Sequence, residues 1–75
     1  MPNKEILLDV SNLEAPQPLI EAVMALNKLQ DDEVLLFKHR MSPEHLFNEI
    51  SARNFSYEII KNEPNNFQMK IYKEA

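Results

Sequence analysis

The sequence predicts an α/β two-layer sandwich with the order β-α-β-α-β-β, a mixed four-stranded sheet carrying two helices on one face. Short apolar runs alternate with amphipathic runs along the first part of the chain. Prolines mark the starts of both amphipathic runs, and two alternating segments around a Pro-Asn-Asn turn close the chain. Because crossovers between parallel strands are right-handed, both helices fall on the same face of the sheet. The first three strands then run parallel, and the fourth returns antiparallel.

Four segments show strand patterns. Ile6-Leu7-Leu8 is a continuous apolar run, which is typical of a strand in a parallel sheet. The last two segments alternate between apolar and polar residues, and Pro64-Asn65-Asn66 between them is a hairpin signal. The predicted strands are Glu5 to Val10, Glu33 to His39, Ser56 to Lys61 and Phe67 to Lys73.

Two helices are predicted between these strands. In the first, Gln17 to Leu29, apolar residues recur at helical spacing. The second begins at Ser42-Pro43-Glu44-His45, where Ser42 is expected to cap the helix and Pro43 to take its first position. The chain has no glycine, so Asn54 is expected to adopt the left-handed conformation that ends this helix.

Composition narrows the class of protein. Seventy-five residues with 44% hydrophobic and 27% charged residues fit one small globular domain, residues 1–75. The net charge of -4, with both signs interspersed, argues against nucleic-acid binding. There is no cysteine for a disulfide or thiolate chemistry, and no apolar run long enough to span a membrane. Since the start of the chain lacks a signal-peptide pattern, the expected location is the cytoplasm.

The stretch Leu8-Asp9-Val10, followed by Leu13-Glu14-Ala15-Pro16-Gln17-Pro18-Leu19, resembles the opening of the TusA/SirA-like small sulfur-carrier proteins. Those proteins open with Leu-Asp, a Leu, and then Cys-Pro-x-Pro at a helix start. Asp32-Glu33-Val34-Leu35-Leu36 is similar to their second strand. His39 to Phe47 and the segment from Tyr57 to Tyr72 resemble a cysteine-less branch, described only as a domain of unknown function.

The resemblance implies the fold, but one residue of this chain differs from the motif at the position on which the family's best-known activity depends. Pro16 and Pro18 match the motif prolines, but Ala15 stands where the sulfur-carrying cysteine would be. A methyl group cannot form a persulfide, so sulfur-carrier activity is not implied. What the resemblance does suggest is a setting in bacterial redox, sulfur or respiratory metabolism. A sulfur-relay component that relies on a partner's cysteine remains an alternative.

The predicted site lies where the parallel strands end, because the loops that leave these ends emerge on one side of the sheet. Two helix N-termini point to this edge, as does the hairpin from Glu63 to Asn66. The functional interpretation is docking of a small anionic ligand or a partner's acidic tail; the plain alternative is solvated loops with ordinary caps. The candidate residues are Ser11, Asn12, Glu14, Ala15, Pro16, Pro18, Lys38, His39, Arg40 and Ser42.

Two kinds of chemistry are conceivable at this edge. His39, Met41 and His45 offer imidazole and thioether ligands for a transition metal or haem iron, although their spacing matches no established motif. Ser11 or Ser42 could serve a hydrolytic triad, but a chain without glycine forms no nucleophile elbow. No catalytic residue and no resident metal or cofactor is therefore expected.

The sheet face opposite the helices is the remaining candidate surface. Gln68, Lys70 and Tyr72 predict a solvated face, whereas exposure of Leu35 or Phe37 there would make a sticky partner site. The function that follows is a non-enzymatic binding or adaptor domain with a protein partner. It is expected to be a monomer or weak homodimer that binds neither nucleic acid nor membrane, with a metal or haem accessory role as the alternative.

Overall fold

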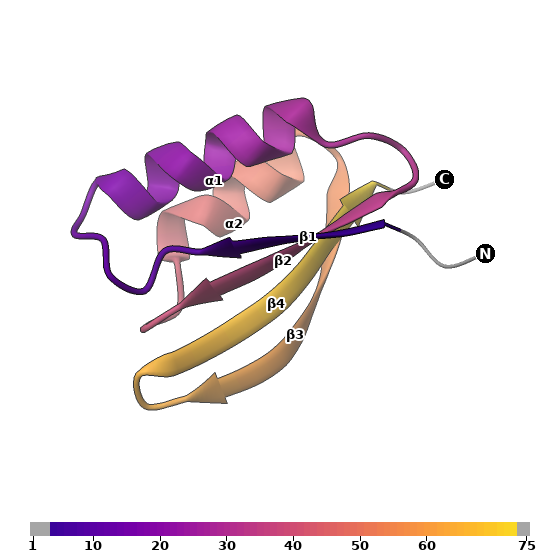
Figure 1. Ribbon diagram of the computed structural model, residues 1–75. Coiled ribbons are helices and arrows are strands. Elements are labelled where there is room, and N and C mark those ends of the chain that lie inside the picture. Colours follow the sequence, from indigo (N-terminus) through magenta and orange to yellow (C-terminus); the bar gives the residue numbers. More distant parts are fainter. Residues whose placement is uncertain (1–3, 74–75) are drawn as a thin grey trace.

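The computed structural model describes residues 4–73, which form six elements in the order that the sequence predicts (Figure 1). Predicted boundaries agree with the observed ones to within a few residues. The elements are β1 Lys4–Asp9, α1 Gln17–Lys28, β2 Glu33–His39, α2 Glu44–Ala52, β3 Phe55–Glu63 and β4 Asn66–Lys73. The fold is an α/β two-layer sandwich, as expected.

The four strands form one sheet in the order β1-β2-β4-β3. β1 pairs parallel to β2, and β4 lies antiparallel between β2 and β3. The first three strands therefore run in one direction and the fourth returns, which confirms the predicted directions. As a result β1, β2 and β3 all end at the same edge of the sheet, where the hairpin also turns (Figure 1).

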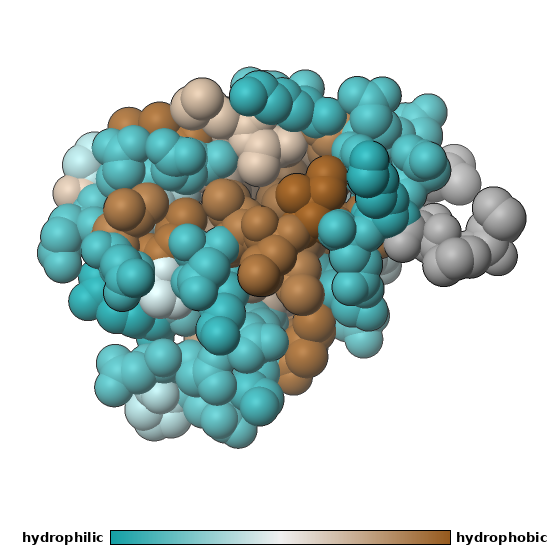
Figure 2. All heavy atoms as spheres, in the orientation of Figure 1, coloured by the Kyte–Doolittle hydropathy of each residue, from teal (hydrophilic) through white to brown (hydrophobic). Residues whose placement is uncertain are grey.

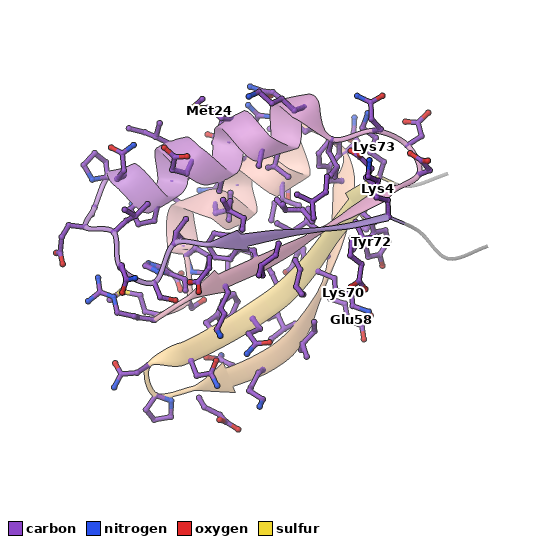
Figure 3. All side chains as sticks on the ribbon, in the orientation of Figure 1. Lys4, Met24, Glu58, Lys70, Tyr72 and Lys73 are labelled. Carbon is purple, nitrogen blue, oxygen red and sulfur yellow. The ribbon has the colours of Figure 1, made fainter. Side chains whose placement is uncertain are left out.

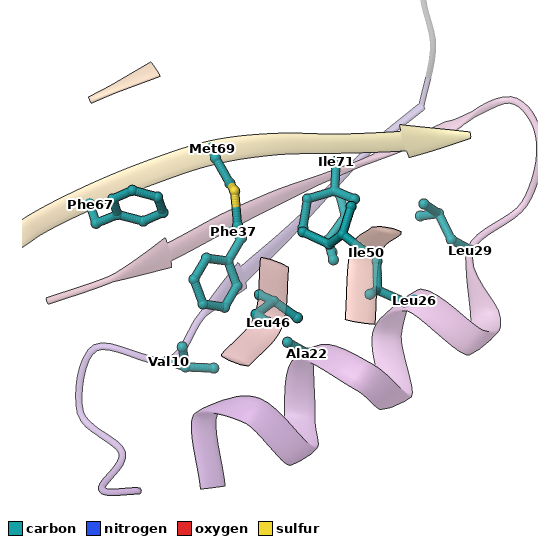
Figure 4. Packing of buried hydrophobic residues seen from close by; sticks show 11 residues of the cluster. Val10, Ala22, Leu26, Leu29, Phe37, Leu46, Ile50, Phe67, Met69 and Ile71 are labelled. Atoms are coloured by element: carbon teal, nitrogen blue, oxygen red, sulfur yellow. The ribbon is translucent and has the colours of Figure 1, made fainter. Parts of the chain in front are cut away.

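Both helices cover one face of the sheet, and the core fills the space between the layers (Figures 1 and 4). Alternate residues of the strands point to this face, so Leu35, Phe37 and Met69 are fully buried beneath the helices. The interpretation that Leu35 or Phe37 makes the opposite face sticky is thus wrong, because strand alternation turns both toward the core. The core cluster is Val10, Ala22, Leu26, Leu29, Leu35, Phe37, Leu46, Ile50, Phe67, Met69 and Ile71.

The opposite face of the sheet carries polar and charged side chains over its β4 and β3 side. Figure 3 shows Glu58, Lys70 and Tyr72 on the side away from the helices. Lys70 is paired with Glu58 of β3 and with Leu36 of β2, and Leu36 in turn with Leu7 of β1. Along this row of the open face, the side chains change from apolar at β1 and β2 to charged at β4 and β3.

The start of α2 differs from the prediction. Its N-cap residue is Pro43, with φ −89° and ψ 85°, and no side chain caps the helix. The first turn is closed instead by the amide of Leu46, which donates to the carbonyl of Pro43 at 3.0 Å. Ser42 lies one residue before the cap position, and it makes no cap hydrogen bond. The predicted cap is thus wrong because the helix begins at Glu44, one residue later than the pattern suggested.

Asparagines take the left-handed positions that glycine occupies in most proteins. Asn54 ends α2 with φ 59°, as predicted, and Asn65 turns the β3–β4 hairpin with φ 60°. They are the positive-φ residues within the described range 4–73. Asn tolerates this region better than other residues that carry a Cβ, because its short polar side chain can hydrogen-bond locally.

Replacing Asn54 by alanine is expected to lower the free energy of unfolding by about 1 kcal/mol, because alanine has no local compensation for the left-handed backbone. Asn54→Gly should not destabilise the fold through this backbone position. Asn48→Ala, at an exposed position within α2, is the matched control and should change stability little. Urea denaturation measures all three; equal losses for Asn54→Ala and Asn54→Gly would show that backbone conformation is not the cause.

Candidate functional site

A cavity of about 450 Å³ lies at the sheet edge where β1 and β2 end. It is formed by the loop from β1 to α1 on one side and the loop from β2 to α2 on the other. Its volume is in the range of small-molecule sites, and its lining is mainly apolar, as such sites generally are. The lining residues are Leu13, Glu14, Ala15, Pro16, Pro18, Leu19, Phe37, His39, Arg40, Met41, Ser42, Pro43, Glu44, His45 and Leu46.

The first loop is held in place by its own backbone. The amide of Val10 continues the parallel ladder by donating to the carbonyl of Lys38 at 2.9 Å, and the amide of Leu13 closes a turn onto the carbonyl of Val10. The Asp9 carboxylate accepts a hydrogen bond from the Ser11 amide at 3.0 Å. Hydrogen bonds from the Ser11 side chain and amide lower the pKa of Asp9, so this brace holds at neutral pH.

Arg40 joins the two loops across the cavity. Its Nη2 atom donates to the carbonyl of Leu13 at 3.1 Å and lies 3.6 Å from the Glu14 carboxylate. The Glu14 side chain is 88% exposed, so this ion pair is weakly held, whereas the Leu13 bond is partly buried. The Nε atom of Arg40 is buried without a hydrogen-bond partner. Arg40 is therefore a structural link with donor capacity to spare.

The N-terminus of α1 offers fewer free amides than the sequence suggested. The Gln17 amide donates to the carbonyl of Glu14 at 2.9 Å, and Pro18 has no N–H to donate. Within the first turn of this helix, the amide of Leu19 is the one that remains able to donate a hydrogen bond to a ligand. An anion at this end of the cavity would depend more on the Arg40 guanidinium than on the helix terminus.

His39 lies at the end of β2 beneath the helices, with 7% of its surface exposed. Its ring packs edge-on against Phe37 at 6.1 Å between centroids, and its Nδ1 atom is buried without a hydrogen-bond partner. Burial lowers the pKa of His39, and the charge of Arg40 lowers it further, against smaller opposing effects of the Val10 backbone and Asp9. The imidazole is thus neutral at pH 7.

The structure brings most of the predicted site residues together. The candidates that line the cavity are Glu14, Ala15, Pro16, Pro18, His39, Arg40 and Ser42. Ser11 and Asn12 belong to the turn before it and do not line it. Lys38 does not line it either, because neighbouring residues of a strand point to opposite faces and His39 takes the covered face.

The three weak metal candidates also lie around this cavity, since His39, Met41 and His45 all contribute to its lining. A cluster of three or more His, Cys, Asp or Glu side chains able to hold a metal ion is not found among residues 4–73. The hairpin turns at the same sheet edge, as expected, but contributes no lining residue.

Sequence reasoning missed the apolar half of the site. Leu13, Leu19, Phe37 and Leu46 line the cavity together with the polar candidates. The sequence pattern assigns them to core or motif positions, because an apolar residue beside a loop looks the same in sequence whether a pocket opens next to it or not. One available signal was the flanking of both loops by apolar residues on each side.

Neither helix in the described part of the chain is long and apolar enough to cross a membrane.

Residues 7–73 match the model of a protein family described as "Uncharacterized conserved protein (DUF2249)", and the chain belongs to this family. The match covers both helices, the strands β2, β3 and β4, and the second half of β1. Searches of curated proteins and of solved structures found no match.

His39 is expected to make stability fall as the pH drops. Because the pKa of His39 in the folded protein lies below its ordinary value of 6.5, the unfolded chain binds the proton more readily. The free energy of unfolding is therefore highest above pH 6.5 and declines as the pH falls below that value. Urea denaturation between about pH 7.5 and about pH 5 measures this decline.

His39→Phe should remove this part of the pH dependence, and His45→Gln, at an exposed position, should keep it. The comparison between variants separates His39 from carboxyl groups that titrate at lower pH. A His39→Phe profile parallel to that of the wild type would contradict the assignment.

Proposed function

We propose that this DUF2249-family domain is a non-enzymatic binding module whose edge cavity takes a small molecule with an apolar body and one carboxylate. One observation carries the proposal: the cavity of about 450 Å³ has mainly apolar walls and one guanidinium, that of Arg40, whose side chain is 39% exposed. Small-molecule sites combine these features, with apolar walls for affinity and a small number of polar groups for orientation.

The carboxylate specificity rests on the contacts of Arg40. A guanidinium binds carboxylates through two parallel N–H donors, and Arg40 spends one terminal nitrogen on the Leu13 carbonyl. Glu14 holds the guanidinium only at 3.6 Å and from an exposed position. A ligand carboxylate would take the place of Glu14 as the counterion, and the released Glu14 side chain would return to water.

The non-enzymatic character is proposed from the residues at the cavity wall. Ala15 has only a methyl group at the position where the TusA/SirA-like sulfur carriers have their cysteine. His39 is neutral, but its Nδ1 atom is buried. The wall thus supplies shape and one positive charge, Arg40, with Glu14 and Glu44 as its carboxylates, rather than a nucleophile paired with a base.

The fold order and the Pro16-Gln17-Pro18 start of α1 also support kinship with the TusA/SirA-like proteins. In this proposal the family's sulfur site has become a ligand cavity, because Ala15 lines it at the corresponding position. A role linked to bacterial redox, sulfur or respiratory metabolism in the cytoplasm follows from that kinship and is part of the proposal.

A metal or haem accessory role is the second candidate, supported by the lining of one cavity by His39, Met41 and His45. An absorbance spectrum and metal analysis of the purified protein distinguish it from the first candidate. Bound metal or haem in stoichiometric amount would favour the second candidate, and binding of an apolar carboxylate would favour the first.

Octanoate is the probe for the proposed site, and its binding is followed by amide chemical shifts in NMR spectra. Shifts are expected in the loops from Leu13 to Leu19 and from His39 to Leu46. Arg40→Gln should weaken binding about tenfold, the usual scale for a lost charge-assisted hydrogen bond. Octanol, with the same apolar body and no charge, should bind about as weakly to the wild type as to the variant.

Lys38→Gln is the matched control, because Lys38 is two residues away on the same strand end and does not line the cavity. It should bind octanoate like the wild type. If both substitutions weakened octanoate binding equally, the binding would depend on the net charge of the protein and not on a specific site. Unchanged spectra at millimolar octanoate would reject the proposal.

Ala15→Cys tests the kinship with sulfur carriers. Arg40 and the α1 N-terminus both favour a thiolate at the cavity wall, so the thiol pKa should lie below the free value of about 8.5. Iodoacetamide alkylation as a function of pH measures it. Ser51→Cys, exposed in the last turn of α2, is the control and should not fall below that value. An alkylation midpoint for Ala15→Cys at or above that of the control would end the analogy with the sulfur site.

A further inference from the structure

We propose that two copies of this chain associate along the free edge of β1, about a twofold axis, to form one continuous sheet of four strands from each copy. This inference does not depend on the ligand cavity, with which the surface shares no lining residue. It rests on unpaired backbone groups, on an apolar band beside them, and on a self-complementary pair of charges on α1.

The first observation is the backbone of β1, which lies at one edge of the sheet. The amides of Lys4 and Val10 donate to the carbonyls of Asp32 and Lys38, so even-numbered residues direct their hydrogen-bonding groups toward β2. In a parallel pair the intervening residues direct theirs the other way. The N–H and C=O groups of Glu5, Leu7 and Asp9 therefore face outward, spaced to pair with another strand.

The second observation is the apolar surface along this edge. Leu7 is 64% exposed on the open face, and Ile6 and Leu8 on the other face line a groove between β1 and α1. Met24, 48% exposed, and Ala25 form the helix side of the same groove. Figure 2 shows the resulting band of hydrophobic atoms running between the helix layer and the strands. Such a band next to unpaired backbone is typical of an association surface.

The third observation is charge, and it identifies the occupant as a second copy. Glu21 and Lys28 lie on the groove side of α1, with Met24 and Ala25 midway between them. A twofold axis through this midpoint makes the two α1 helices antiparallel and places Glu21 of each copy beside Lys28 of the other. The surface is thus complementary to itself, which a symmetric dimer requires.

The strand and the helix agree on the position of this axis. An axis at Leu7 pairs Ile6 with Leu8 of the second copy and aligns the outward backbone groups of the two strands. The same residues, Ile6 and Leu8, line the groove together with Glu21 and Lys28. One axis through Leu7 and the middle of α1 therefore satisfies both elements. It also brings Glu5 opposite Asp9 of the second copy, a like-charge contact that keeps the dimer weak.

The other edge of the sheet is less suited to pairing. β3 also exposes apolar side chains, but its register shifts between Ile59 and Lys61, and charged residues follow the shift. An irregularity and a lysine on an edge strand are typical devices against pairing. The pairing of β1 with β2, in contrast, is regular from Lys4 to Asp9.

Analytical ultracentrifugation over a concentration series, at low salt, tests the dimer. The wild type is expected to sediment as a monomer–dimer equilibrium. Lys28→Glu and Glu21→Lys should each raise the dissociation constant about tenfold, because each turns two symmetry-related attractions into repulsions. The double variant Glu21→Lys/Lys28→Glu restores opposite charges across the axis and should return to the wild-type constant. Lys61→Glu, on the other edge, should leave it unchanged.

An NMR spectrum of each variant confirms that it is folded, so loss of the dimer is not confused with loss of the protein. Wild-type protein that stays monomeric up to millimolar concentration would overturn the proposal. A double variant as weak as the single ones would overturn this arrangement of the copies. Sensitivity to Lys61→Glu in place of Lys28→Glu would assign the association to β3 and reject the β1 edge.

Discussion

The parallel pairing of β1 with β2 is the constraint on which the rest of the structure depends. Because the two strands are parallel, the chain leaves both of them at their carboxyl ends, on the same side of the sheet. The two strand-to-helix loops therefore lie side by side and line the cavity. The pairing also sets which face each residue of β1 presents, and which backbone groups are left outward. Arg40 then fixes the loops to one another through the Leu13 carbonyl. The cavity and the free edge are thus two consequences of one register.

Much of the fold could be predicted because its signals are local. Apolar runs and helical spacing are read within about ten residues, and they indicate the order of elements and the strand directions. The absence of glycine made Asn54 the natural residue to end α2, and its φ of 59° confirms this. The Ser42 cap failed because the choice between Ser42 and Pro43 as cap depends on loop geometry that two neighbouring residues do not encode.

The site was less predictable because it depends on contacts distant in sequence. The run Lys38-His39-Arg40 reads as one basic cluster, yet the alternation of the strand sends Lys38 to the open face and buries His39 under the helices. The contribution of Arg40 is a bond to a carbonyl 27 residues earlier, which no composition or spacing reveals. The apolar walls were invisible for the same reason, since Phe37 and Leu46 become neighbours only when α2 packs on the sheet.

The cavity and the proposed dimer surface both use residues of α1 but share no lining residue, and this determines how they relate. About a twofold axis through Leu7, the β1 strands of the two copies run antiparallel. The carboxyl ends of these strands, next to which the cavities lie, therefore point in opposite directions. The two cavities therefore open at opposite ends of the double sheet. A ligand in one cavity would touch neither the other cavity nor the charges of Glu21 and Lys28. Ligand binding and self-association would then be energetically independent, because coupling requires that a ligand contact the two association states differently.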